Sequence, residues 1–130
     1  MTRRERFPHD DPREWLNRAR SNLAHARNRA SEVYLEDLCF CAQQAAEKAI
    51  KALMIARGIE FPYVHDLDHL LSLLAERGES IPSAVRRASE LTRYATATRY
   101  PGAVRPVTEA EYLEALELAD AVVRWAEEAV

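Results

Sequence analysis

Two amides, a carboxylate and two lysines stand in the middle of an alanine-rich stretch between residues 39 and 58. Amide groups can bind the edges of a base or a ribose, and ammonium groups can bind phosphate, so this combination could recognise a nucleotide. Alternatively, the residues form the solvated side of a helix, where Glu47 and Lys51 have the i,i+4 spacing of an ion pair worth about 0.3–0.5 kcal/mol. Residue types alone leave both interpretations open. The residues are Gln43, Gln44, Glu47, Lys48 and Lys51.

A second group of chemically capable residues is His65-Asp66-Leu67-Asp68-His69. Its two histidines have the i,i+4 spacing that can ligate a metal on one face of a helix. Asp66 is better suited to cap a helix, which leaves only His69 clearly inside that helix. No other cluster of histidine or cysteine in the sequence could complete four ligands. We therefore expect no metal site and no cofactor.

Arg99 and Tyr100 could present a cation and an aromatic ring at the end of a helix, directly before Pro101-Gly102. An arginine there could meet a phosphate while the tyrosine meets a base. Alternatively, Arg99 satisfies the last carbonyl groups of its own helix. The sequence leaves both interpretations open.

Several other kinds of chemistry are disfavoured. The sequence has no G-x-S-x-G motif, and three isolated glycines cannot build a phosphate-cradling loop. Cys39 and Cys41 would lie about 200° apart around a helix, so we expect free thiols in a cytoplasmic protein. A net charge of −3 and a pI near 5.8 argue against a strongly basic nucleic-acid-binding protein. No run of 18 apolar residues and no apolar leader occur, so we expect neither a membrane span nor a signal peptide.

Five helices must position these residues, because apolar residues recur at helical spacing and no strand pattern occurs. Capping signals mark helix starts at Asp11-Pro12 and at Thr108 with Glu111. We expect a flexible tail over residues 1 to 10, followed by one domain over residues 11 to 130. The expected fold is all-α, an antiparallel up-and-down helical bundle. The expected helices cover residues 11 to about 30, 35–58, 66–78, 82–101, and 108 onward.

Three blocks of residues occur together: CAQQAAEKAIKAL at residues 41–53, His65-Asp66-Leu67 followed by Leu70-Leu71, and Tyr94-Ala95 followed by Arg99-Tyr100-Pro101. Together they resemble the HEPN domain, the higher eukaryotes and prokaryotes nucleotide-binding domain. The resemblance covers residues 11 to 129. It implies a helical bundle that commonly forms a homodimer. It also implies a minimal nucleotidyltransferase as partner, the two acting as toxin and antitoxin or in nucleotide handling in bacteria and archaea.

Many HEPN proteins are metal-independent ribonucleases that use an arginine followed, after four to six residues, by a histidine. Here Arg99 falls in the expected region, but no histidine follows it, because all four histidines lie at or before His69. Similar strings occur at residues 4–9 and 20–25, yet residues five apart on a helix lie about 140° out of register. We therefore predict no catalytic residue.

The leading hypothesis is a nucleotide-binding module, or a nucleotidyltransferase partner, that lacks the ribonuclease motif. Glu47 would orient the two lysines, and His65 would lie at the mouth of the site. A ribonuclease and a bundle that only binds a protein partner are the alternatives, and RNA is a further candidate ligand. The predicted binding residues are Gln43, Gln44, Glu47, Lys48, Lys51, His65, Arg99 and Tyr100.

Overall fold

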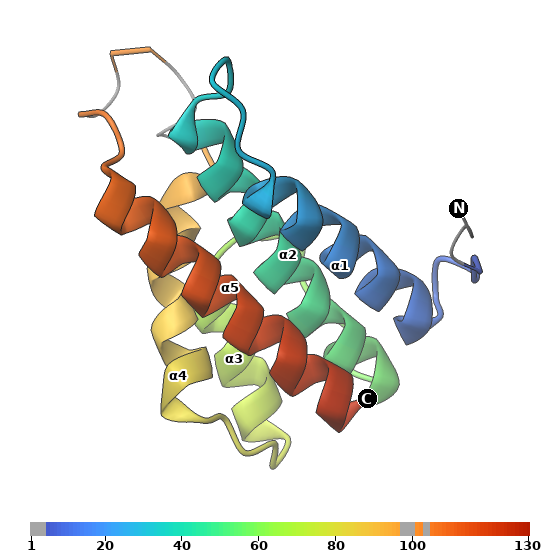
Figure 1. Ribbon diagram of the computed structural model, residues 1–130. Coiled ribbons are helices and arrows are strands. Elements are labelled where there is room, and N and C mark those ends of the chain that lie inside the picture. Colours follow the sequence, from blue (N-terminus) through green and yellow to red (C-terminus); the bar gives the residue numbers. More distant parts are fainter. Residues whose placement is uncertain (1–4, 97–100, 103–104) are drawn as a thin grey trace.

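The computed structural model describes residues 5–96, 101–102 and 105–130. Within these residues the chain forms five α-helices and one 3₁₀ helix, without any strand. The expected all-α helical bundle is thereby confirmed (Figure 1). The elements are α1 (Pro12–Arg27), α2 (Leu35–Ala56), α3 (Leu67–Glu76), α4 (Ser83–Arg86), η1 (Arg87–Tyr94) and α5 (Glu109–Ala129).

Helices α1, α3 and α5 begin where capping side chains satisfy their first backbone N–H groups. Asp11 accepts a hydrogen bond of 2.8 Å from the N–H of Arg13, and Asp66 caps α3 in the same way. At α5, Thr108 and Glu111 form a reciprocal capping box with bonds of 2.9 and 3.1 Å. These local signals fix the starts of α1, α3 and α5 and hence the directions in which their side chains point.

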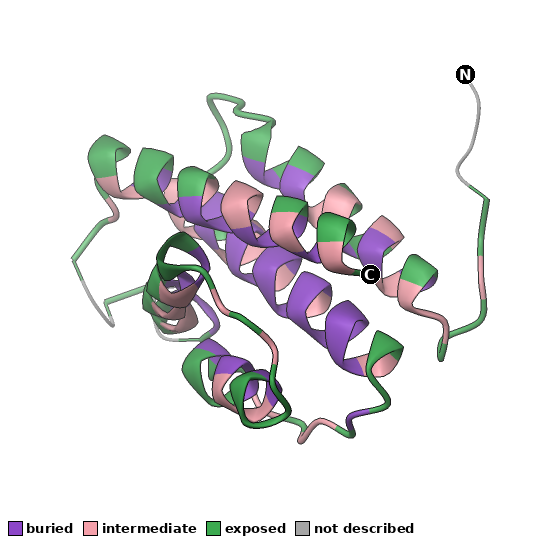
Figure 2. Ribbon diagram, turned by 90° about the horizontal axis from the view of Figure 1, so that it is seen from below, coloured by how far each residue is buried: buried purple, intermediate pink, exposed green. Residues whose placement is uncertain are grey.

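The central element is α2, which packs against α1, α3, α5 and η1 and is the most deeply buried helix in Figure 2. Its apolar side is rich in small residues, which let the neighbouring helices approach closely. Five of its alanines are completely buried: Ala42, Ala45, Ala46, Ala49 and Ala52. This packing fixes the direction in which the polar residues of α2 point.

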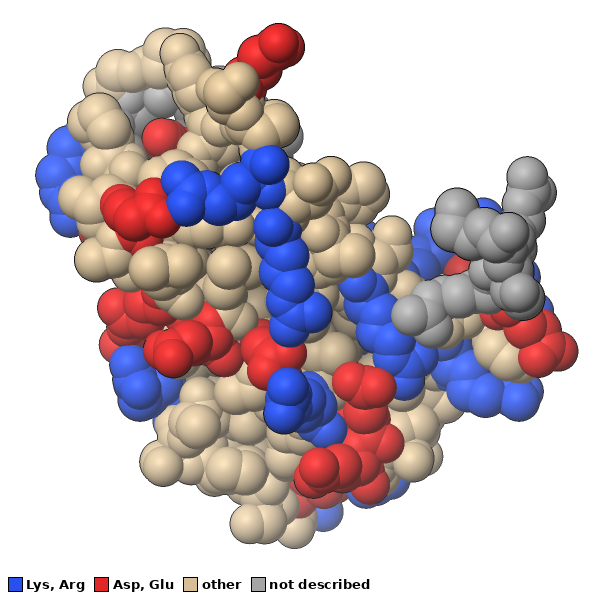
Figure 3. All heavy atoms as spheres, viewed as in Figure 1, with Lys and Arg blue, Asp and Glu red and all other residues tan. Residues whose placement is uncertain are grey.

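On one side of α2, helices α1 and α5 lie next to each other (Figure 1). The hydroxyl of Tyr112 donates a 2.6 Å hydrogen bond to the carbonyl of Ala26, and Arg20 pairs with Glu127 at 2.9 Å. Positive and negative side chains alternate over this face in Figure 3, so it is not a uniformly basic surface. Among the residues described, none of the helices combines the length and hydropathy that a bilayer crossing requires.

The fourth helix differs from the prediction. Residues 82–101 were expected to form one α-helix, but residues 83–94 form a single α-turn, α4, followed by the 3₁₀ helix η1; residues 97–100 lie outside the described part of the chain. The buried residues of α4 and η1 are three apart, and a helix with three residues per turn places them all on the side that faces the core. The hydroxyl of Thr92 also accepts a 3.1 Å bond from the N–H of Leu67, which joins η1 to α3. The buried residues are Val85, Ala88, Leu91 and Tyr94.

Candidate functional site

Three of the polar residues predicted on α2 are buried. Gln43, Glu47 and Lys51 are 0%, 5% and 6% exposed, so the interpretation as a solvated helix face does not describe them. Gln44 and Lys48, on the neighbouring row of the helix, are half-buried. A polar group that leaves water needs a partner inside the protein, so the contacts of each residue decide its role.

Glu47 is the centre of a buried hydrogen-bond network. Its Oε1 accepts bonds of 2.8 Å from Nε2 of Gln43 and from Nδ1 of His65, and its Oε2 accepts a 2.9 Å bond from Nζ of Lys51. Burial would raise the pKa of Glu47, but the bonds from Lys51, His65 and Gln43 outweigh it and lower that pKa. Gln44 extends the network through a 2.8 Å bond to Oε1 of Gln43. We name these five residues the Glu47 network.

The Glu47 network joins α2 to the loop that precedes α3. Lys51 Nζ lies 5.1 Å from the centre of the Phe61 ring, which itself makes an edge contact with Trp15 at 5.6 Å between centroids. The imidazole of His65 is 57% exposed although its Nδ1 is held by Glu47. A carboxylate that binds Nδ1 orients the ring and leaves Nε2 for proton exchange. Gln43, Glu47 and Lys51 are therefore occupied by internal contacts, and His65 alone reaches well into solvent.

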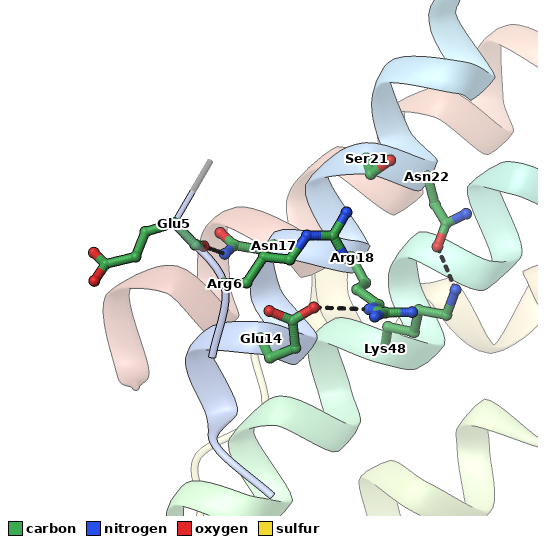
Figure 4. Close-up of a pocket in the computed structure, with 8 residues that line it drawn as sticks. All are labelled: Glu5, Arg6, Glu14, Asn17, Arg18, Ser21, Asn22 and Lys48. Atoms are coloured by element: carbon green, nitrogen blue, oxygen red, sulfur yellow. Dashed lines mark hydrogen bonds and ion pairs between the residues drawn. The ribbon is translucent and has the colours of Figure 1, made fainter. Parts of the chain in front are cut away.

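Lys48 points toward α1 instead. Its Nζ donates a 2.8 Å hydrogen bond to Oδ1 of Asn22 (Figure 4), and within the part of the chain that the structure describes it forms no ion pair. Burial, and next the positive charge of Arg18, lower the pKa of the Lys48 amine. Lys48 is thus a half-buried cation whose hydrogen-bond partner is neutral.

Lys48 lies in a hollow between α1, α2 and residues 5–11, a segment that we call the N-terminal strap. This hollow, which we call the polar groove, has a volume of about 590 Å³. A second hollow of about 310 Å³ shares Glu14, Arg18 and Lys48 with it, and adds Phe7, His9 and Trp15. The polar groove is lined by Glu5, Arg6, Glu14, Asn17, Arg18, Ser21, Asn22 and Lys48 (Figure 4).

Glu14 connects the strap to α1. Its Oε1 accepts a 3.0 Å bond from the N–H of Phe7, and its Oε2 accepts a 2.9 Å bond from Nε of Arg18. These two bonds, that of Phe7 first, lower the pKa of Glu14. Glu14 thus pairs with Arg18 and holds the strap against α1, so it shapes the polar groove.

Sequence reasoning named Lys48 as a candidate binding residue but not the residues that surround it in the polar groove. Asn22 and Arg18 lie on a different helix, and Arg6 was assigned to the tail. No spacing rule connects them to residue 48, because contacts between separate segments are set by packing. Arg99 and Tyr100 lie outside the residues that the structure describes.

Other candidate groups do not form a second site in the described residues. Arg20 pairs with Glu127 of α5, while His25 is exposed at the end of α1. Burial raises the pKa of the Cys39 thiol to about 12, which makes it a weak nucleophile. In the described parts of the chain, no three histidine, cysteine or acidic residues come together in a way that could hold a metal ion.

Comparison with known proteins gives a family. The HEPN domain matches residues 12–129. TT1696 from Thermus thermophilus, whose crystal structure is known, shares 37% sequence identity with this chain. The two structures superpose with a TM-score of 0.81, and the match covers 92% of this chain and 98% of TT1696. ST0689, an archaeal HEPN homologue, is 30% identical with a TM-score of 0.73, over 91% and 96% of the two chains. None of the curated proteins matches.

Proposed function

Because this chain belongs to the HEPN domain family, we propose that it is a nucleotide-binding module whose polar groove holds the phosphate groups of the ligand. The observation that carries this proposal is the environment of Lys48. Its ammonium group is half-buried, its hydrogen bond goes to a neutral amide oxygen, and Arg18 adds a second positive charge. A phosphate in the polar groove would offset the burial and the repulsion of these cations.

The second hollow suits the nucleoside part of the same ligand. It opens from the polar groove at Glu14, Arg18 and Lys48, and its remaining lining consists of Phe7, His9 and Trp15. Apolar and aromatic walls with a few polar groups are typical of small-molecule sites. The Glu47 network would then stabilise the position of α2 through its contact with the loop before α3. Two further predicted contacts remain part of the proposal: Arg99 and Tyr100, which would close the site.

Calorimetric titration with ATP, GTP and UTP tests the proposal. We expect heat of binding for the unmodified protein and a loss of affinity of about tenfold in Lys48→Gln, the usual effect of removing one charge-assisted hydrogen bond. Arg124→Gln is the matched control, because Arg124 is an exposed arginine of α5 paired with Asp120, away from the groove. The proposal is wrong if no nucleotide gives heat beyond dilution at millimolar concentration.

We further propose a homodimer that acts with a minimal nucleotidyltransferase as a toxin–antitoxin-like pair in the cytoplasm of a prokaryote. Structures similar to this one come from a bacterium and an archaeon, and the free thiols of Cys39 and Cys41 suit a reducing compartment. Light scattering should give twice the chain mass, and the product of the neighbouring gene should co-purify after co-expression. A monomer that purifies alone would count against both parts.

Ribonuclease activity is the second candidate, because Glu47 holds Nδ1 of His65 and leaves Nε2 for proton transfer. In this case purified protein cleaves RNA in the presence of a chelator, and His65→Gln abolishes the cleavage. His69→Gln is the control, since His69 is an exposed histidine of α3 whose side chain lines neither hollow. If the His65→Gln variant still cleaves RNA, His65 is not a catalytic residue.

A further inference from the structure

The N-terminal strap holds Arg6 in a defined position. The carbonyl of Glu5 accepts a 2.9 Å bond from Nδ2 of Asn17, and the N–H of Phe7 donates a 3.0 Å bond to Glu14. The residues on both sides of Arg6 are therefore bonded to α1. The Arg13 guanidinium also lies 4.0 Å from the centre of the Phe7 ring. An arginine between two anchored neighbours loses less conformational entropy on binding a ligand than one on a loose tail.

Arg6 completes a set of three cations around the polar groove. Figure 4 shows its side chain running from the strap toward α1, whereas the side chain of Glu5 points away from the groove. The strap contributes Arg6, α1 contributes Arg18, and α2 contributes Lys48. Among the described residues, only Arg18 of these three forms an ion pair, with Glu14. Even with both lining glutamates, Glu5 and Glu14, counted, the three cations leave the groove with an excess of positive charge.

We propose that the ligand carries a chain of phosphates and that Arg6, from the strap, binds the part of the chain farthest from the nucleoside. This inference rests on the proposed function. The nucleoside hollow is lined by Trp15 and His9 and meets the polar groove at Lys48 and Arg18, so the phosphates extend from there toward Arg6. A groove of about 590 Å³ with a cation on each of three walls suits several linked phosphates better than one.

The test compares ligands that differ only in phosphate number: AMP, ADP and ATP, and orthophosphate, pyrophosphate and tripolyphosphate. In calorimetry on the full chain, we expect ATP to bind at least about tenfold more tightly than AMP. Arg6→Gln should remove most of this difference and change AMP affinity little. Arg6→Lys should restore part of it, while Arg124→Gln should behave like the unmodified protein. All variants should keep the unmodified thermal midpoint.

The outcomes separate this inference from the proposed function. If AMP and ATP bind equally, or if Arg6→Gln binds ATP like the unmodified protein, the inference is wrong although nucleotide binding stands. Tripolyphosphate could also bind in a way that depends on Arg6 while no nucleotide binds more tightly than tripolyphosphate. That result would support the binding of a phosphate chain by Arg6 and would contradict recognition of the nucleoside. If neither nucleotide nor tripolyphosphate binds, both proposals are wrong.

Discussion

Glu47 is the residue on which the buried network of α2 depends, because it is buried together with Lys51 and bonded to Gln43 and His65. Removing a carboxylate and an ammonium group from water is costly, and the hydrogen bonds of the network offset that cost. On the sequence these residues suggested ligand contacts. Because these residues are bonded to one another and all but His65 are buried, they hold the loop before α3 against α2. Of the two lysines on α2, Lys48 lines the polar groove and Lys51 does not.

We predict that Glu47→Gln lowers the free energy of unfolding by about 3 kcal/mol, because the Lys51 ammonium is left buried without its counter-charge. Urea titration at pH 7 measures this change. Glu76→Gln is the control, an exposed glutamate at the end of α3, and should cost less than about 0.5 kcal/mol. Combining Glu47→Gln with Lys51→Met should recover part of the loss. A double variant no more stable than the single one would contradict the role assigned to the pair.

The buried pair of Glu47 and Lys51 also predicts that the free energy of unfolding depends on pH. The pKa of Glu47 is lower in the folded protein than its ordinary value, so its stabilising contribution is complete above the unfolded pKa, at about pH 4.3 and higher. The contribution is lost as the pH falls through the folded pKa. The stability difference between unmodified protein and Glu47→Gln should therefore narrow below about pH 4. A difference that stays constant from pH 7 to pH 3 would show that the charge of Glu47 is not responsible.

At the scale of elements, local signals predicted most of the fold. The caps at Asp11, Asp66 and Thr108 act within one turn of the chain, so their effect can be deduced from adjacent residues. The 3₁₀ helix η1 could not be deduced, because the apolar residues of this stretch also include the pairs Ala84–Ala88 and Leu91–Ala95, whose i,i+4 spacing fits an α-helix. The burial of Gln43 and Lys51 could not be deduced either, since it depends on Phe61 and His65 from a distant loop.

The candidate site shows the same limit. Lys48 was predicted from its residue type and from its place in a block that resembles HEPN domains. Its partners Asn22 and Arg18 lie on α1, and Arg6 lies on the strap, so only the packing of three segments brings them together. The sequence around Arg6 has no helical or strand periodicity and was expected to be a flexible tail. The bonds that its neighbours make to Asn17 and Glu14 are contacts that periodicity cannot reveal.

In the whole molecule, helix α2 contributes residues to two separate groups of polar side chains, the Glu47 network and the polar groove. The Glu47 network faces the loop before α3, and the polar groove faces α1 and the strap. The net charge of −3 and the alternating charges over the face in Figure 3 argue against binding through a broad basic surface. We propose instead that recognition is concentrated in the polar groove, and we expect affinity to weaken with added salt because the proposed contacts are electrostatic.

Chemical-shift mapping by NMR tests the central claim, binding of a nucleotide in the polar groove, most directly. With ATP added to isotope-labelled protein, the account predicts that the largest shifts fall on Asn17, Asn22, Lys48 and the strap. The amides around Leu113 on the far part of α5, which line neither hollow, should shift little. Saturable shifts confined to His65 and α3, or no shifts at millimolar ATP, would contradict it.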